Sequence, residues 1–425
     1  MGKEGKLSTF RAFQNRNYAL YFSGQSISLI GTWMQRTGVS WVVYTMTHSA
    51  FMLGLTMFAS QFPSFLFSLF GGILADRYNR YKIILITQTA SLIQAVLLAI
   101  LALSNHYVVW EILALSAMLG IINAFDVPAR QPLIHELVTD KKDLPNALAL
   151  NSSMANIARL VGPALSGIIL EAYGAGSCFL LNAFSFLAVI FSLLIMKLST
   201  YEPRPGKKKA RQELAEGFMY IRKTPAIGMV LMLLSVVSLL VLPYDTLLPV
   251  FAKVIFSGNA TTFGYITSCI GLGAVVGTFF LASLKPGTDL KFVLLINTLI
   301  LGVGMMLFSH MKNFPMAMLF GAIFGFGAMS QTTICLTLIQ IHAAPEMRGR
   351  VMSYVAMGFF GMLPLGSLIV GGVSQVIGAP NTLLVQGMLA LIIAVVFSRF
   401  LSKDRLNRKD EIQMKVAEDQ VMTEL

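Results

Sequence analysis

Long apolar runs separated by short polar segments occupy this chain from residue 17 to residue 402. Each run has roughly 20 or more mostly apolar residues, the length that a helix needs to span a bilayer. A helix also satisfies its own backbone hydrogen bonds in lipid, so helices are the expected elements. The pattern therefore predicts an all-α integral membrane protein with twelve transmembrane helices. The runs span about 17–46, 51–75, 82–104, 107–132, 144–173, 176–198, 226–253, 262–284, 290–309, 314–341, 351–377 and 380–402.

One polar segment, Ser199–Thr224, is longer than the other internal ones and separates six runs from six. Its first part holds the run Lys207-Lys208-Lys209, which either keeps a solvated linker on the cytoplasmic side or binds anionic lipid. Its later part has Leu214, Phe218 and Ile221 at helical spacing, which predicts an amphipathic helix along the membrane surface. We therefore expect a linker between two halves.

Weak internal similarity relates these halves at an offset of about 204 residues, because Gly167–Ala175 lines up with Gly371–Ala379. A duplicated half predicts two pseudo-symmetric six-helix bundles. The expected domains are a cytoplasmic N-terminus 1–16, an N-terminal bundle 17–198, a linker 199–225, a C-terminal bundle 226–402 and a cytoplasmic tail 403–425.

Composition and charge agree with a membrane protein. The 425 residues are 56% hydrophobic and 12% charged, whereas a soluble chain has about a quarter charged residues. The net charge of +12 is not a nucleic-acid footprint, because its cations fall on the termini, the linker and every second loop. Only Lys253 and Lys312 fall on the opposite side. This asymmetry predicts that both termini are cytoplasmic and that the bilayer, not a nucleic acid, is the partner.

Polar side chains form one face of the first predicted helix and another face of the tenth. A polar face toward lipid is unfavourable, so we expect both faces to line a central path for a small-molecule substrate. Hydrogen bonding between helices is the alternative explanation. The predicted path residues are Gln25, Ser28, Thr32, Gln35, Arg36, Ser330, Thr333, Thr337 and Gln340.

Asp245 stands between Pro243 and Pro249 in the seventh predicted helix. Two prolines should break the helix there and free backbone carbonyls beside the carboxylate. Arg36 lies at a comparable depth in the first helix, so we hypothesise that Arg36 and Asp245 meet across the two halves. Protonation of Asp245 would then weaken the pair and bias outward opening. The alternatives are a permanent ion pair and two residues that never meet.

Four stretches carry a resemblance: Gly31–Gln35, Gly71–Lys82, Asp126–Ile134 and Pro345–Ser353. The second combines a glycine pair, one carboxylate and three cations in a short loop. Together they resemble the major facilitator superfamily, and within it the branch of bacterial enterobactin exporters and drug–proton antiporters. The resemblance implies a multi-pass transporter of the bacterial inner (plasma) membrane that exports a siderophore-like or drug-like amphiphile by alternating access, with protons as the coupling ion.

The resemblance also implies that the Gly71–Lys82 loop and the adjacent helix ends lock the cytoplasmic side. The expected lock residues are Gly72, Asp76, Arg77, Arg80, Asp126 and Arg130. From the sequence alone, Asp126 and Arg130 either neutralise each other or share charge with Asp76 and Arg80. Helix 5 resembles the Gly-Pro-rich motif of antiporters, although Ser166 stands where that pattern has glycine. The residues singled out there are Asn156, Arg159, Gly162, Pro163 and Gly167.

Other function classes find little support in the sequence. There is no phosphate-binding glycine loop before a lysine and no His/Cys cluster for a catalytic metal, so we expect no enzyme activity, no cofactor and no metal site. A lipid or metal-ion carrier of the same fold is the alternative transporter, and a membrane receptor or enzyme is a further one. We expect a monomer.

Overall fold

The computed structural model describes residues 10–104, 108–138, 140–196, 210–285 and 287–399. In these ranges the regular structure is helical and contains no strand. Predictions made for the first nine residues, for Lys207–Lys209 and for the tail 403–425 lie outside the described residues.

Helices follow one another through both halves with short turns between them. The first half contains η1 (Arg11–Gln14), α1 (Arg16–Thr47), α2 (Ala50–Arg77), α3 (Arg80–Ser104), α4 (Val109–Leu137), η2 (Lys141–Asp143) and α5 (Leu144–Ile195). The connection between the halves contains α6 (Ala210–Lys223). The second half contains α7 (Pro225–Leu240), η3 (Leu242–Leu247), α8 (Leu248–Val250), η4 (Phe251–Ile255), α9 (Ala260–Ala282), α10 (Leu290–Ser309), α11 (Phe314–His342), α12 (Arg348–Ala356), η5 (Met357–Gly361), α13 (Met362–Ile377) and a last helix, Ala379–Arg399.

Ten helical segments in the described residues are long and apolar enough to cross a membrane. One of them, α5, has 52 residues and breaks at Gly174, so it supplies two crossings. α1 is not among the ten, because its polar face makes it less apolar than the other spans. Its 32 residues are nevertheless more than a crossing needs. The twelve transmembrane helices predicted from the sequence are therefore confirmed.

The internal repeat reappears in the backbone as the same break in each half. Gly174 has φ 78° and Gly378 has φ 82°, in the left-handed region that glycine adopts without steric cost. Gly174 ends the fifth crossing, and Gly378 ends α13, which completes the eleventh. The matched stretches Gly167–Ala175 and Gly371–Ala379 thus each turn the chain back into the membrane.

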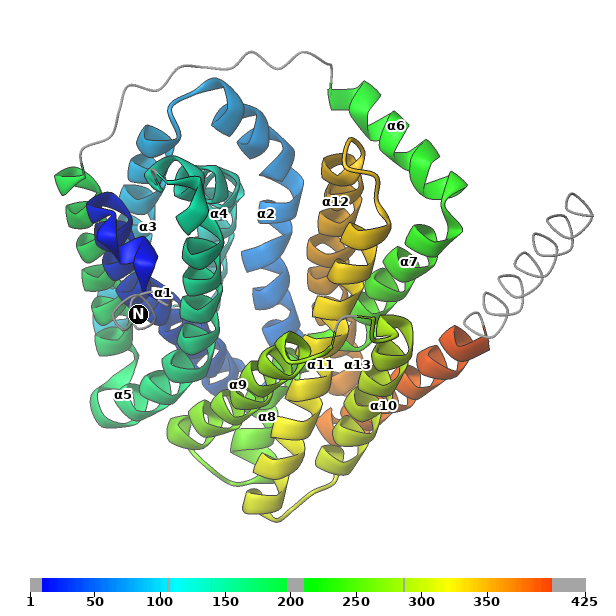
Figure 1. The fold of residues 1–425 in the computed structure, drawn as a ribbon. Coiled ribbons are helices and arrows are strands. Elements are labelled where there is room, and N and C mark those ends of the chain that lie inside the picture. Colours follow the sequence, from blue (N-terminus) through cyan, green and yellow to red (C-terminus); the bar gives the residue numbers. More distant parts are fainter. Residues whose placement is uncertain (1–9, 105–107, 139, 197–209, 286, 400–425) are drawn as a thin grey trace, which may run out of the picture.

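The two halves meet at one end of the bundle and separate at the other. We call the end that carries α6 and the α2–α3 turn the linker side, and the opposite end the distal side. Contacts between the halves come mainly from α5 against α9 and from α2 against α13. Figure 1 shows α2 and α12 standing apart on the linker side, and the two halves converging toward the distal side, where α9 and α13 lie.

The seventh crossing is discontinuous, as its two prolines predicted. The 16 residues of the apolar helix α7 give way to the 3₁₀ segment η3, and a π-helical segment, η4, follows the short α8. The amide nitrogen of Gln386 on the last helix donates to the carbonyl oxygens of Leu240 (3.3 Å) and Val241 (3.2 Å). A side chain thereby satisfies backbone groups that the broken helix leaves without partners.

Candidate transport site

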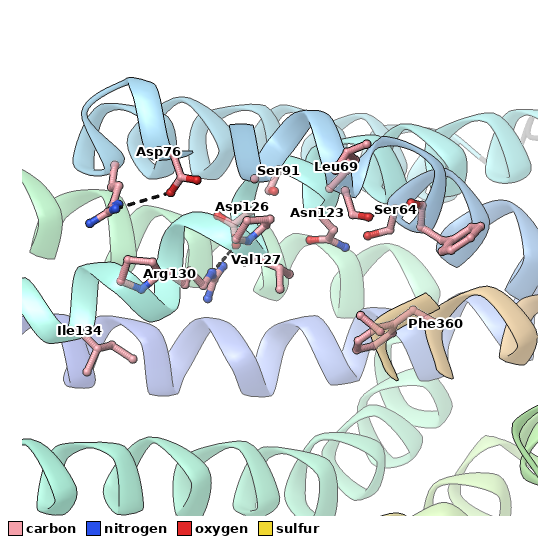
Figure 2. Close-up of a pocket in the computed structure, with 18 of the residues that line it drawn as sticks. Ser64, Leu69, Asp76, Ser91, Asn123, Asp126, Val127, Arg130, Ile134 and Phe360 are labelled. Carbon is pink, nitrogen blue, oxygen red and sulfur yellow. Dashed lines mark hydrogen bonds and ion pairs between the residues drawn. The ribbon is translucent and has the colours of Figure 1, made fainter. Parts of the chain in front are cut away.

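A cavity of about 2460 Å³ lies between the two halves. Its walls come from α1, α2, α3, α4 and α5 of the first half and from α12 and η5 of the second. Because the α2–α3 turn and Leu214 of α6 also line it, the cavity opens on the linker side. Figure 2 shows this lining from Asp76 and Arg130 in the first half to Phe360 in the second. The volume is larger than the roughly 300–1,000 Å³ of ordinary ligand pockets, so it can hold a small organic molecule together with water.

The predicted polar face of α1 divides between the cavity and the interior of the first half. Gln25 and Thr32 line the cavity, whereas Ser28 and Gln35 are buried among helices. Gln35 donates to Gln94 of α3 (3.0 Å), and its oxygen accepts a hydrogen bond from an asparagine of α5 (2.7 Å). For Gln35, the structure therefore favours hydrogen bonding between helices, the alternative to the path.

The polar face of α11 lies away from this cavity. Ser330 is fully buried and packs toward α9, where it faces Gly277. The hydroxyl of Thr337 donates to the carbonyl of Thr333 one turn earlier (2.9 Å), and Gln340 is exposed near the end of the helix. Among the described residues that line the cavity, these four are absent.

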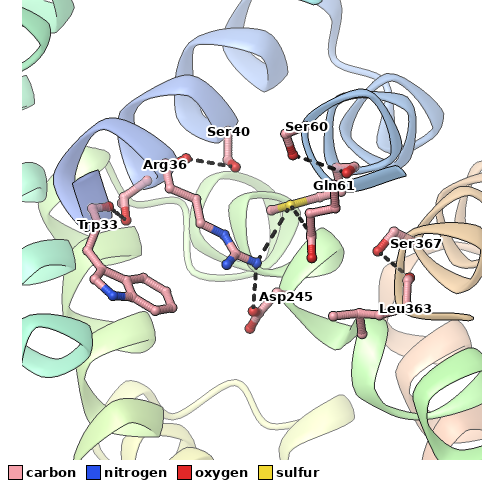
Figure 3. Close-up of polar contacts among 10 residues, drawn as sticks. Trp33, Arg36, Ser40, Ser60, Gln61, Asp245, Leu363 and Ser367 are labelled. Atoms are coloured by element: carbon pink, nitrogen blue, oxygen red, sulfur yellow. Dashed lines mark hydrogen bonds and ion pairs between the residues drawn. The ribbon is translucent and has the colours of Figure 1, made fainter. Parts of the chain in front are cut away.

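Arg36 and Asp245 lie together at the boundary between the halves. Their side chains form an ion pair with 3.6 Å between Nη2 and Oδ2, and Figure 3 shows the guanidinium of α1 directed at the carboxylate of η3. A second contact joins Arg36 Nη2 to the sulfur of Met57 at 3.9 Å. The arginine side chain is 38% exposed and the aspartate side chain 40%, so packing does not fully enclose the pair although it lies within membrane-spanning helices.

Glycines of α5 allow close helix contacts on two sides. An added Cβ at Gly162 would lie 2.5 Å from the Cβ of Trp33 on α1. An added Cβ at Gly167 would lie 2.7 Å from the carbonyl oxygen of Ala260, and one at Gly264 of α9 would lie 2.5 Å from the carbonyl oxygen of Pro163. The helix-5 motif thus packs α5 against α1 and against the second half.

Arg159, from the same motif, faces the boundary between the halves. Its guanidinium carbon lies 5.3 Å from the ring centre of Trp33, and its Nη1 lies 3.4 Å from the sulfur of Met329 on α11. Asn156, one turn before it, is partly buried. Arg36 and Arg159 therefore both contact the second half.

Asp126 and Arg130 of α4 form an ion pair, shown in Figure 2. The carboxylate is almost fully buried and also accepts hydrogen bonds from the Thr87 hydroxyl (2.6 Å) and the Gln88 amide (2.9 Å) of α3. Of the two arrangements left open by the sequence, the structure has Asp126 and Arg130 neutralising each other. Three donors satisfy the buried carboxylate inside the first half.

Arg80 is the centre of a second ionic cluster, at the mouth of the cavity. Its Nη1 lies 2.5 Å from Glu136 at the end of α4, and its Nη2 lies 3.8 Å from Asp76. Its Nε donates to the carbonyl of Ala75 (3.0 Å) and so closes the end of α2. Arg77 lines the same mouth. All six residues expected to form a lock line the cavity, and on this side the halves are apart.

The two glycines before this cluster have different surroundings. An added Cβ at Gly71 would collide with the backbone carbonyl of Ala124 on α4, whereas one at Gly72 would meet nothing within 4 Å. Gly72 lines the cavity, as the other expected lock residues do, and the close helix contact is made at Gly71. Helix rotation decides which glycine of the pair faces the neighbouring helix.

Sequence reasoning overlooked four site residues: Glu136, Trp33, Thr87 and Gln88. Glu136 could have been found, because a carboxylate ending the fourth crossing emerges on the same side as the cationic loop. Trp33 belongs to the Gly31–Gln35 stretch, but an aromatic residue in an apolar helix is common, so the sequence does not indicate a role for it. Among the described residues, no group of three or more His, Cys, Asp or Glu side chains is arranged to hold a metal ion.

Known proteins resemble this chain over nearly its whole length. Residues 7–425 match a family described as transmembrane secretion effector. The chain is 27% identical over 383 residues to the staphyloferrin A transporter of Staphylococcus aureus, with 89% of this chain and 94% of that protein covered. It is 24% identical over 405 residues to the enterobactin exporter of Escherichia coli O1:K1, with 93% and 94% covered.

Solved structures share the fold at low sequence identity. A POT family transporter in complex with 5-aminolevulinic acid superposes with a TM-score of 0.73 at 13% identity, over 92% of this chain and 96% of that one. A bacterial homologue of the human lysosomal transporter Spinster, in an inward-facing and unoccupied conformation, gives a TM-score of 0.71 at 15% identity, over 92% and 98%. The chain is a transporter of the major facilitator superfamily and belongs to its transmembrane secretion effector family.

Proposed function

We propose that this protein is a secondary active transporter that exports a siderophore-like amphiphile across the bacterial inner membrane. In this proposal the substrate enters from the cytoplasm on the linker side and leaves on the distal side by alternating access, with protons as the coupling ion. The observation that carries the proposal is the cavity of about 2460 Å³, which opens to the linker side while helix contacts between the halves close the distal side.

The distribution of cations supports a cytoplasmic linker side. The α2–α3 turn carries Arg77, Arg80 and Lys82 there, and α6 ends with Arg222 and Lys223. On the distal side, the cations among the described residues are Lys253 and Lys312. Cytoplasmic loops of membrane proteins carry an excess of Lys and Arg, so this orientation is the favoured one.

Small contacts that are easy to separate support alternating access. On the distal side, the Gln375 side chain of α13 accepts hydrogen bonds from Ser49 Oγ and Ala50 N, both at 3.2 Å. In the other contact between the halves, the Thr261 hydroxyl of α9 donates to the carbonyl of Gly167 on α5 (3.3 Å). If these contacts separated and α2 closed toward α12, the distal side would open and the linker side would close. Each such hydrogen bond contributes about 0.6 kcal/mol in a membrane protein, which suits a reversible step.

The Arg36–Asp245 pair supports proton coupling. It joins α1 of the first half to η3 of the second, and both side chains are partly exposed. A proton on Asp245 removes the charge that holds Arg36, so protonation weakens one link between the halves. A ligand or proton shifts a conformational equilibrium only when it favours one state, and this contact provides such a difference.

The substrate class follows from the named relatives. One is called a staphyloferrin A transporter and another an enterobactin exporter, and each matches at least 89% of this chain. Both names refer to siderophores, so a siderophore-like molecule is the substrate that we propose. No observation on the described residues favours the lipid or metal-ion carrier considered from the sequence.

Inverted membrane vesicles with an acidic interior provide the test. Uptake into such vesicles corresponds to export from the cell, and we would follow a carboxylate siderophore and enterobactin with and without the pH gradient. We expect gradient-dependent accumulation by the wild type and none by Asp245→Asn. Lys312→Gln, which also removes one charge but at an exposed distal turn, should transport like the wild type.

Two outcomes would contradict parts of the proposal. Equal accumulation without a gradient, or by Asp245→Asn, would exclude proton coupling through this carboxylate. No accumulation of either siderophore by folded wild-type protein would exclude siderophore export. Thermal unfolding of each variant would establish that it is folded.

A further inference from the structure

Two arginines of the first half share one aromatic ring at the boundary between the halves. The guanidinium carbon of Arg36 lies 5.1 Å from the ring centre of Trp33, and that of Arg159 lies 5.3 Å from the same centre. The carboxylate of Asp245 forms an ion pair with Arg36 at 3.6 Å. Both guanidinium groups are close enough to act electrostatically on this carboxylate. The cluster therefore holds two positive charges and one negative charge.

Of the two arginines beside Trp33, Arg159 is the one that forms no ion pair with a carboxylate of the described residues. Among the described residues it makes no ion pair, and its polar contact is the Met329 sulfur at 3.4 Å, a weak acceptor. A charged side chain within membrane-spanning helices is unfavourable unless it meets an opposite charge, a hydrogen-bond acceptor or water. Most of the five N–H donors of this guanidinium are thus available to a ligand.

The cluster stands one helical turn beyond the inner end of the cavity. Thr32 on α1 and Ala155 on α5 line the cavity, and Arg36 and Arg159 follow them by four residues on the same helix faces. On α2, Gln61 lines the cavity, and the side chain one turn further in is the methionine whose sulfur contacts Arg36. A molecule that entered from the linker side would reach this cluster last.

Aromatic side chains accompany the charges. Trp33 lies beside both arginines, and Tyr244, next to Asp245 in the chain, packs edge-on against Phe324 of α11 with 5.0 Å between ring centres. Guanidinium groups match carboxylates by paired parallel hydrogen bonds, and they also stack on aromatic faces. The chemistry of the cluster thus suits a ligand that combines an acidic group with an apolar part.

We propose that Arg159 is the residue that selects the substrate, by binding a free carboxylate of an amphiphile at the boundary between the halves, one helical turn beyond the cavity. This inference rests on the proposed function, because it names the substrate class of the same transport path. Arg36 already has a carboxylate partner in Asp245, so the substrate carboxylate pairs with Arg159. Because Arg159 also contacts Met329 of the second half, a bound carboxylate bridges the halves.

A matched pair of fluorescent probes tests the proposal. The acid 11-(dansylamino)undecanoic acid and its methyl ester differ in the charged carboxylate, and binding of each to the purified full-length protein can be followed by dansyl emission. Hydrogen bonds to charged groups are strong enough that we expect the wild type to prefer the acid by at least about tenfold. Arg159→Gln should lose that preference by weakening acid binding, while ester binding stays unchanged.

Two further variants separate a selective role from a structural one. Arg159→Lys keeps the charge but loses the planar fork, so it should keep part of the preference for the acid. Lys312→Gln removes an exposed charge in the distal turn between α10 and α11 and should keep the full preference. Equal binding of acid and ester by the wild type, or an unchanged preference in Arg159→Gln, would overturn the proposal.

Failure of this inference differs from failure of the proposed function. Siderophore accumulation in vesicles that is as efficient in Arg159→Gln as in the wild type would leave export standing and remove Arg159 from substrate selection. A preference for the acid that depends on Arg159, together with no siderophore accumulation, would leave the carboxylate site standing and remove siderophore export. Better binding of enterobactin, a catecholate, than of carboxylate probes would overturn the choice of acidic group.

Discussion

Gln375 should control the balance between the two open states, and its two replacements should act in opposite directions. Its side-chain oxygen, on α13 of the second half, accepts hydrogen bonds from Ser49 Oγ and Ala50 N at the start of α2. Gln375→Ala removes both bonds. Gln375→Glu keeps the accepting oxygen and places a negative charge at the N-terminus of α2, where the helix dipole favours it.

The expected size of the alanine effect comes from the two hydrogen bonds lost, and that of the glutamate effect comes from the charge gained. Two bonds of about 0.6 kcal/mol each amount to about 1.2 kcal/mol, so Gln375→Ala should raise the ratio of distal-open to linker-open molecules roughly eightfold. A charge at a helix N-terminus contributes about 0.3–1 kcal/mol at low salt, so Gln375→Glu should lower the ratio by roughly two- to fivefold.

Double electron–electron resonance between two spin labels would measure the ratio of distal-open to linker-open molecules. Tyr173, 75% exposed at the distal end of the fifth crossing, and Lys312, exposed in the second half, are suitable label positions. The three native cysteines would be replaced first. Opening of the distal side lengthens the distance between the labels, so alanine should enlarge the long-distance population and glutamate should reduce it.

High salt should weaken the effect of Gln375→Glu on the ratio of the two open states, because that effect is electrostatic. The effect of Gln375→Ala should remain. Identical distance distributions for all three proteins would refute the view that these bonds hold the distal side closed. A shift in the same direction for alanine and glutamate would refute the role of the accepting oxygen.

Two further predictions concern the linker side. Gly71→Ala should lower the melting temperature, because its Cβ would collide with the Ala124 carbonyl and overpacking costs about 1–3 kcal/mol. Gly72→Ala, whose Cβ would meet nothing within 4 Å, should unfold like the wild type. Equal melting temperatures for the two variants would contradict the contact assigned to Gly71. Glu136→Gln should slow transport in the vesicle assay more than Asp76→Asn, because Glu136 lies 2.5 Å from Arg80 and Asp76 lies 3.8 Å away with its side chain 73% exposed. A larger effect of Asp76→Asn would contradict this ranking and would point to a contact that Asp76 makes only in the distal-open state.

The local chemistry of the chain made most of the fold predictable. Span lengths and the absence of backbone partners in lipid require helices, and this requirement acts on each segment separately. Pro243 and Pro249 broke the seventh crossing where expected, since proline lacks the N–H that a helix needs. The repeat at about 204 residues placed Gly174 and Gly378 at the same turn in both halves.

The site was predictable only in part, because helical periodicity places polar residues on a face without saying what that face meets. Thr32 lines the cavity and Gln35, three residues later, is buried against α3 and α5. The sequence left two arrangements for Asp126 and Arg130, and the packing of α3 against α4 brought Thr87 and Gln88 to the carboxylate.

The sequence by itself thus determined that the chain crosses a membrane twelve times in two related halves, and which helices carry intramembrane charges. Tertiary structure decided the rotation of each helix and therefore the partners of those charges. Lipid tails are as apolar as a protein core, so polarity along the chain does not distinguish a lipid-facing surface from a packed one. The shared ring of Trp33 between Arg36 and Arg159 exists only because α5 packs closely on α1 at Gly162.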